Sequence, residues 1–203
     1  MFSPGGRHLE RGWPGRIEGD RVIQLAAQTL QSYFSGGGKA REHAEYALAE
    51  VDLLAPVLHP PSVRLFDGDD FAFANPAAIH GPGDEIRSPA ARLGYELRPT
   101  AIVGGEGGIG GFTLMNVLTA PELGGAKARD FALVLGPVVI TPEEAVTPMT
   151  DPDWPGLIEH AARNTRLLPG DVIAADPLET GSVDGVVELS IEEIGTLRNV
   201  VRG

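Results

Sequence analysis

The sequence contains no cysteine among its 203 residues. Disulfides, thiolate metal ligands and a cysteine nucleophile are therefore excluded. Positive charge is also scarce, because 16 lysine and arginine residues stand against 28 aspartate and glutamate residues, a net charge of −12. A chain of this sign is a poor partner for nucleic acid, whose phosphates attract basic surfaces. Small molecules and protein partners are the ligand classes that remain.

Long apolar runs are missing as well. No stretch approaches the roughly 20 apolar residues that a membrane-spanning helix needs, so we expect no membrane partner. The first residues, MFSPGGRHLERGWPGR, lack the apolar segment of a secretion signal, and we expect a cytoplasmic protein. A hydrophobic content of 42% over this length is enough for one large domain with its own core.

Glycine and proline are abundant, with 27 and 17 residues, and they separate short apolar runs. Such runs of strand length, rich in Val, Ile and Phe and bounded by turn residues, predict β-strands. Those in the middle of the chain are Ala101–Val103, Phe112–Met115, Phe131–Leu135 and Val138–Ile140. Further on we expect a helix at Trp154–Arg163 and strands at Leu168–Ile173, Val186–Ile191 and Leu197–Val201. The pattern predicts a mainly β protein.

The N-terminal quarter has a different pattern. Residues 1–19 show no periodicity, and we expect a poorly ordered lead. From Asp20 the apolar residues recur at spacings of three and four, which predicts a helix that ends at the glycines 36–38. Ala40–Glu50 is predicted to form a second helix, and Val51–Val57 a strand. We therefore divide the chain into residues 1–52, a flexible N-terminus with a helical lead, and residues 53–203, the main β domain.

Six segments between Leu53 and Val201 carry a family resemblance. In chain order they are LLAPVLHPPSVRLF, NPAAIHGPGDEIRSP, YELRPTAIVGG, GGFTLMNV, AKARDFALVLGPVVITPEE, and the pair HAARNTRLLPGDVIA and IGTLRNVV. This series resembles the fumarylacetoacetate hydrolase family. The resemblance implies a mainly β (α+β) fold, a β-sandwich roll, here with a short N-terminal helical lead. It also implies a homodimer, with the strands around Phe112–Met115 and Phe131–Leu135 close to the interface.

The family resembled here binds Mg²⁺ or a similar cation through carboxylates, and the ligand positions are mostly changed in this chain. The first Glu of the Y-E-x-E segment is Glu96, but the second is Arg98. The positions of the other two carboxylates are Val117 and Leu65. Hard cations need several charged oxygens, so we expect no metal and no cofactor. Mg²⁺ or Mn²⁺ at Glu96 is the less favoured alternative, which Asp67, Asp69 or Asp70 would have to complete.

The histidine that serves hydrolytic relatives as a base, in an F-E-x-H segment, has no counterpart. VRLFDGDD leads almost directly into FAFANP, so the segment that would carry it is absent. His59, His80 and His160 match no catalytic position of the family, and we expect them to be surface or capping residues. The loss argues against hydrolysis of a carbon–carbon bond.

The residues that remain at family positions outline a pocket. We assign catalytic roles to Glu96, Arg98 and Lys127, and substrate-binding roles to Phe73, Asn75, Tyr95, Thr113, Asn116 and Asp130. Two interpretations of Arg98 stay open. Its planar donor fork could stabilise an enolate or carboxylate oxygen in place of the metal, in which case Arg98→Met would lower turnover with little harm to folding. It could instead only neutralise Glu96 as a structural ion pair.

Two classes of function follow. The first, towards which the pattern leans, is an enzyme that converts a small oxo or enolisable compound without a metal, by isomerisation, decarboxylation or cyclisation. It would be a lyase, isomerase or cyclase rather than a standard hydrolase, and specialised biosynthesis would suit it. The second is a non-catalytic binding or partner protein with the same fold. A metal-dependent carbon–carbon bond hydrolase with displaced ligands is the third alternative.

Overall fold

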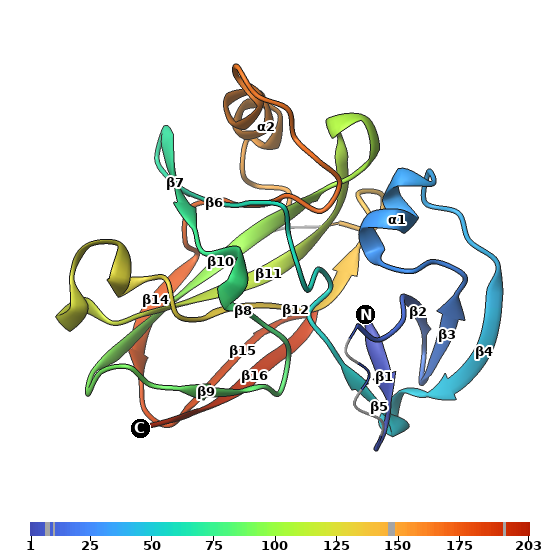
Figure 1. Ribbon diagram of the computed structural model, residues 1–203, viewed down its shortest axis with the longest axis horizontal. Helices are drawn as coiled ribbons and strands as arrows, with labels where there is room; N and C mark the ends of the chain where they lie inside the picture. Colours follow the sequence, from blue (N-terminus) through green and yellow to red (C-terminus); the bar gives the residue numbers. More distant parts are fainter. Residues whose placement is uncertain (7–8, 10, 146–148, 193) are drawn as a thin grey trace.

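A computed structural model describes residues 1–203 except 7–8, 10, 146–148 and 193. In this part of the chain, eight strands form the main sheet: β6 (Val63–Asp67), β7 (Asp70–Ala74), β8 (Ile79–His80), β10 (Leu93–Val103), β11 (Ile109–Thr119), β12 (Leu133–Ile140), β13 (Val172–Ala174) and β14 (Glu179–Val183). Their spatial order is β7-β6-β13-β10-β11-β12-β8, and β14 also pairs with β10. The labelled strands of this sheet can be followed in Figure 1. The mainly β fold is thus confirmed.

The long hairpin β10–β11 forms the centre of this sheet. Its strands are antiparallel, with Glu96 opposite Val117, Arg98 opposite Met115 and Thr100 opposite Thr113. Because side chains alternate between the two faces of a strand, these residues share one face of the sheet. The two strands are joined through the short 3₁₀ turn Gly105–Gly107, so the glycine-rich stretch is a hairpin connection.

The remaining elements of the main body cover the sheet. Strands β9 (Glu85–Arg87), β15 (Val186–Ile191) and β16 (Gly195–Arg202) form a three-stranded sheet. Helix α2 (Trp154–Ala162) is capped at its N-terminus by Asp153, whose side chain accepts a hydrogen bond from the Gly156 amide. The ring of Trp154 packs 5.2 Å from that of Phe112. The expected helix at 154–163 and the last two expected strands are therefore confirmed, whereas β13 is shorter than the strand expected at 168–173.

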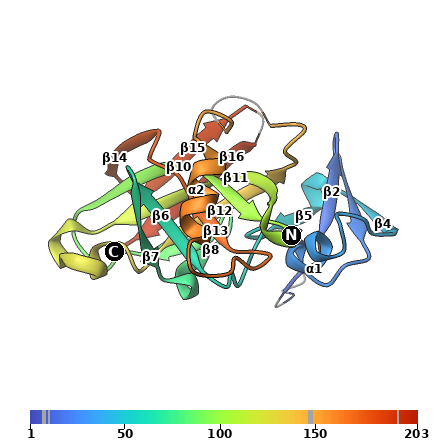
Figure 2. The same ribbon diagram turned by 90° about the horizontal axis from the view of Figure 1, so that it is seen from above.

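The N-terminal strands lie beside the main sheet, at the right of both views (Figures 1 and 2). Strands β1 (Phe2–Pro4) and β5 (Val51–Leu53) pair with each other, and β2 (Gly15–Glu18), β3 (Arg21–Leu25) and β4 (Glu42–Ala47) form a second small sheet. Helix α1 (Leu30–Ser35) is the one α-helix described in this part. The rings of Phe2, Trp13 and Tyr46 pack together, with ring centroids 5.4 to 6.3 Å apart.

The helical lead is confirmed only at the end of its first helix, where α1 stops at the glycines 36–38; the rest of it was wrong, as was the poorly ordered start for the described residues of 1–19. The apolar pair Val22–Ile23 belongs to strand β3, which follows a two-residue hairpin loop at Gly19-Asp20, with Glu18 opposite Arg21. Gly19 has φ = +58° there, a conformation that glycine adopts without strain. The second expected helix is strand β4, because pairing with β3 overrides the helix preference of its Ala and Glu residues. The boundary between residues 52 and 53 stays a prediction.

Two further expectations concern the surroundings of the protein. No helix in the described part of the chain is long and apolar enough to span a membrane. The segments placed near a homodimer interface are buried within a single copy: Leu114, Met115, Leu133 and Leu135 are all fully covered. The homodimer and the cytoplasmic location stay predictions.

Candidate functional site

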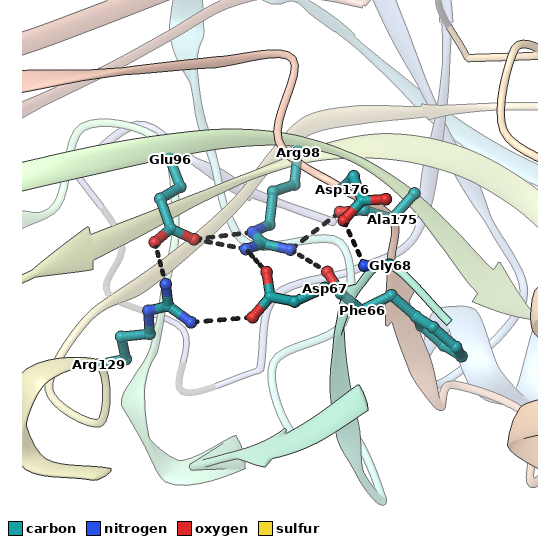
Figure 3. A network of polar contacts seen from close by, with 8 residues as sticks. All are labelled: Phe66, Asp67, Gly68, Glu96, Arg98, Arg129, Ala175 and Asp176. Atoms are coloured by element: carbon teal, nitrogen blue, oxygen red, sulfur yellow. Dashed lines mark hydrogen bonds and ion pairs between the residues drawn. The ribbon is translucent and has the colours of Figure 1, made fainter. Parts of the chain in front are cut away.

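The side chain of Arg98 is 0% exposed and is surrounded by acceptors (Figure 3). Its Nε and Nη2 both donate to Glu96 Oε2, at 2.9 and 2.6 Å. Nη2 also donates to Asp67 Oδ1 at 2.8 Å, and Nη1 donates to the carbonyls of Phe66 and Ala175 at 2.6 and 3.1 Å. A guanidinium has five N–H groups. All five are therefore used inside the protein.

A second guanidinium, that of Arg129, closes the network from the opposite side (Figure 3). Its Nη2 lies 2.6 Å from Glu96 Oε1, and its Nη1 donates to Asp67 Oδ2 at 3.2 Å. The network thus holds two carboxylates and two guanidiniums and is neutral. Arg129 differs from Arg98 because 41% of its side chain is exposed. Its Nε has no partner among the described residues, so Arg129 is the cation of this site that a ligand can reach.

Asp67 is carried into the network by the hairpin β6–β7. It is the last residue of β6 and lies opposite Asp70 across a two-residue loop. Gly68 follows with φ = +68°, where only glycine is unstrained. The Asp176 carboxylate accepts a hydrogen bond from the Gly68 amide at 2.9 Å. This hydrogen bond holds the β6–β7 turn against the loop after β13. In that position the turn places Asp67 between the two arginines.

Partial burial of Asp67 would raise its pKa, but the hydrogen bonds and charges of Arg98 and Arg129 outweigh that effect and hold the pKa below its ordinary value of 3.8. Ionised Asp67 therefore stabilises the fold above the ordinary pKa, and this contribution is lost as the pH falls through the lowered pKa of the folded state.

We expect the melting temperature of Asp67→Asn to lie below that of the wild type at pH 7, and the gap to shrink as the pH falls through the region below about 4. The gap should be small, because the Asp67 side chain is 54% exposed. Thermal melts at stepped pH measure it. A gap that stays constant down to acid unfolding would contradict the pairing of Asp67 with the arginines.

The residues present do not fit a divalent cation. Each oxygen of Glu96 and of Asp67 already faces a guanidinium, and a cation among them would be repelled by both arginines. In the described ranges, no group of three or more His, Asp or Glu side chains could hold a metal ion. Of the three aspartates considered as replacement ligands, Asp67 alone reaches the network.

The other residues at family positions fall into three groups: a polar cluster, an exposed phenylalanine, and three residues that lie outside the network. Lys127 Nζ lies 2.7 Å from Asp130 Oδ2, and Asn75 Nδ2 donates to the Asp130 carbonyl at 3.1 Å. These three form a polar cluster, in which Lys127 and Asp130 are on the same segment of chain as Arg129 and Asn75 comes from the end of β7. Phe73 is an exposed residue of edge strand β7, with its ring 5.2 Å from the guanidinium carbon of Arg64.

Tyr95 and Asn116 point away from Glu96. Asn116 lies opposite Leu97, so it shares the far face of the β10–β11 hairpin with the core residues Leu97, Leu114 and Leu118. Tyr95 is on the same far face and its hydroxyl donates to Glu179. Thr113 is on the near face, but it is buried and donates to the Val138 carbonyl at 2.6 Å. These placements put Tyr95, Thr113 and Asn116 outside the network.

Sequence reasoning missed two features of the site. Arg129 was not considered, although it stands between Lys127 and Asp130. His160 has a carboxylate beside it, because its Nε2 lies 3.6 Å from Asp70 Oδ1. His160 lines a groove of about 690 Å³ together with Phe66, Ala175 and Asp176. The groove borders the network through Phe66 and Ala175, whose carbonyls accept from Arg98, but Arg98, Glu96 and Arg129 do not line it.

No protein-family model matches the sequence, and no curated protein matches it. Solved structures do match. Maleylpyruvate hydrolase from Sphingobium sp. SYK-6 is similar with a TM-score of 0.78 at 20% identity, over 94% of this chain and 96% of that one. A second structure of that enzyme, in complex with manganese(II) ion and pyruvate, matches equally well.

Two more neighbours extend the range of activities. Fumarylacetoacetate hydrolase from the psychrophilic Exiguobacterium antarcticum matches with a TM-score of 0.77 at 21% identity, over 99% of this chain and 98% of that one. A 2-hydroxyhepta-2,4-diene-1,7-dioate isomerase from Mycobacterium marinum matches at 0.74 and 23% identity, over 93% and 92%. The resemblance inferred from the motifs is confirmed at the level of the fold, which hydrolases and isomerases share.

One expectation is corrected by these comparisons. We expected no cofactor, but a protein of the same fold binds manganese together with pyruvate. A metal-free protein therefore does not follow from the fold, and that expectation is not retained.

Proposed function

Because the chain has the fumarylacetoacetate hydrolase fold, we propose that it is an enzyme that acts on a small oxo or enolisable compound. The reaction is an isomerisation, a decarboxylation or a ring closure. In each of these reactions negative charge develops on an enolate-like oxygen. Solved proteins with this fold include hydrolases and an isomerase, which supports an enzyme in general terms.

The observation that carries the proposal is the Arg129 guanidinium. Glu96 and Asp67 orient it, and it stays 41% exposed. A preorganised donor aimed at a developing negative charge is a large source of transition-state stabilisation. Arg98 contributes indirectly, since it holds Glu96 and Asp67 in place with donors that are all engaged by the protein. Lys127 and Asp130, 2.7 Å apart, supply the groups that exchange a proton with the substrate.

The test is enolisation of small 2-oxo acids. Wild-type protein is incubated in D₂O with pyruvate and with longer 2-oxo acids, both with and without added manganese, and loss of the C3 proton signal is followed by NMR. We expect exchange well above the buffer rate for at least one compound. Proton exchange no faster than in buffer alone, for every compound and both with and without manganese, would refute the proposal.

A non-catalytic binding protein is the second candidate, and the saturation of Arg98 supports it. A network whose deepest guanidinium spends all five donors on the protein is also what a purely structural ion cluster looks like. Binding of a 2-oxo acid without any turnover would favour this candidate. Turnover that appears only with manganese would instead favour the third alternative, a metal-dependent hydrolase.

A further inference from the structure

Two carboxylates bridge the same two guanidiniums, and they differ in how firmly the fold holds them. Glu96 lies within the central strand β10, and its side chain is 10% exposed. Asp67 lies at the end of β6, next to the hairpin turn, and its side chain is 54% exposed. Rotation of the Asp67 side chain can carry its carboxylate into water. The Glu96 carboxylate is buried and could leave only if the central strand β10 were displaced.

The contacts of Asp67 are those that a free carboxylate makes with a pair of arginines. Oδ1 accepts from Arg98 Nη2 at 2.8 Å, and Oδ2 accepts from Arg129 Nη1 at 3.2 Å. A ligand carboxylate at this position would receive the same two N–H groups. The network would remain neutral, because one negative charge replaces another. Planar guanidinium forks are well suited to such recognition.

We infer that Asp67 is an internal occupant of an anion site formed by Arg98 and Arg129, and that a small carboxylate ligand such as a 2-oxo acid binds there by displacing it. The inference rests on the proposed function and deepens it, since it names the group by which the substrate is held. The apparent affinity of such a site is reduced by the fraction of molecules in which it is open. Asp67 therefore weakens binding by competition.

The backbone around Asp67 favours exchange of the side chain alone. The Gly68 amide is held by Asp176 at 2.9 Å, and the Phe66 carbonyl is held by Arg98 at 2.6 Å. Both contacts flank Asp67 and do not involve its carboxylate. The hairpin can therefore keep its place while the carboxylate leaves, and the displaced Asp67 stays close enough to return when the ligand dissociates.

The experiment is a calorimetric titration of pyruvate into the wild type, Asp67→Asn and a matched control, Asp70→Asn. Asp70 lies opposite Asp67 across the hairpin and is exposed, so the control removes the same charge without touching the arginines. We expect Asp67→Asn to bind pyruvate about tenfold more tightly than the wild type, as when a site occupied nine times in ten is opened. Asp70→Asn should bind like the wild type, and the double variant Asp67→Asn/Arg129→Met should lose the gain.

Asp67→Ala removes the acceptor entirely and supplies the same comparison if the asparagine variant does not fold. A second measurement needs no variant: saturating pyruvate should move the pKa of Asp67 in the wild type back towards its ordinary value, which carboxyl NMR can follow. Equal affinities for the wild type and the Asp67 variants would overturn the inference. So would an equal gain in Asp70→Asn, or pyruvate binding that requires added manganese.

These outcomes are separable from the proposed function, because the readout is binding. If the variants show the expected affinities for pyruvate but no proton exchange is found, the enzyme proposal is refuted and the anion site is retained. Proton exchange with no gain of affinity in the Asp67 variants would leave the enzyme proposal and remove the displaceable carboxylate.

Discussion

Replacing Arg98 by methionine is expected to destabilise the fold severely. The side chain is fully covered, and its loss leaves Glu96 buried without its main partner and the carbonyls of Phe66 and Ala175 without a donor. Removing one member of a buried ion pair costs about 3–5 kcal/mol of unfolding free energy. For a chain of this size that corresponds to a drop in melting temperature on the order of 10 °C.

Arg92→Met is the matched control, since it deletes the same group from the surface. Arg92 is 85% exposed and pairs with Glu122 at 2.9 Å, and exposed pairs contribute little. We expect no measurable change in its melting temperature. Arg98→Lys should fall between the two, because an ammonium retains the charge but cannot supply five directed donors. A melting temperature for Arg98→Met within a few degrees of the wild type would show that the network does not support the fold.

This result would also change how an activity loss in Arg98→Met is read. From the sequence we expected that variant to fold well and to turn over slowly if Arg98 replaces the metal, and to lose stability if Arg98 only neutralises Glu96. With all five donors engaged by the protein, part of any loss of activity should instead reflect the loss of folded molecules, so turnover has to be expressed per folded molecule.

Arg129→Met is expected to show the opposite pattern, with activity lost and the fold retained. Its guanidinium is the reachable cation of the site, and removal of one preorganised donor to a developing charge typically lowers turnover by about 10²–10³. Because 41% of the side chain is exposed and Glu96 keeps its two hydrogen bonds from Arg98, the melting temperature should fall much less than in Arg98→Met. The measurement is the rate of proton exchange for the compound that the wild type enolises, together with thermal melts of both proteins.

Arg129→Lys separates charge from geometry. A lysine can retain one contact but not the bridge between Glu96 and Asp67, so we expect only a small recovery of the rate. Lys127→Met, two residues earlier, is informative beside it: if the Lys127–Asp130 pair exchanges protons with the substrate, this variant loses rate as well without losing pyruvate binding. Wild-type rates in Arg129→Met would end the assignment of Arg129.

Several elements follow from local sequence alone. The short apolar runs around 101–103 and 112–115 and the apolar spacing of 154–163 are strand and helix patterns in themselves, and the structure places strands and a helix there. Glu96 and Arg98 could likewise be placed on one face of one strand, because residues two apart on a strand share a face. The homodimer and the cellular location remain predictions.

The composition of the site was decided by tertiary structure. Arg98 and Arg129 are far apart in the sequence, and only the pairing of β10, β11 and β12 with the path of the loop before β12 brings them together. Asp67 reaches them because Gly68 turns the hairpin at that residue. Tyr95 and Asn116 stand at family positions, as Glu96 does, yet their side chains point to the other face of the sheet.

The N-terminal quarter shows the same division of causes. Its Ala, Glu and Leu residues favour helix in isolation, but β3 offers β4 a row of backbone partners, and the hydrogen bonds of that pairing outweigh a propensity of a few tenths of a kcal/mol per residue. The sequence by itself determined the central strands β10, β11 and β12 of the main sheet, α2 and the likeness to a known fold. Which charges meet, and whether the donors of Arg98 remain free, depended on contacts between segments that no local pattern records.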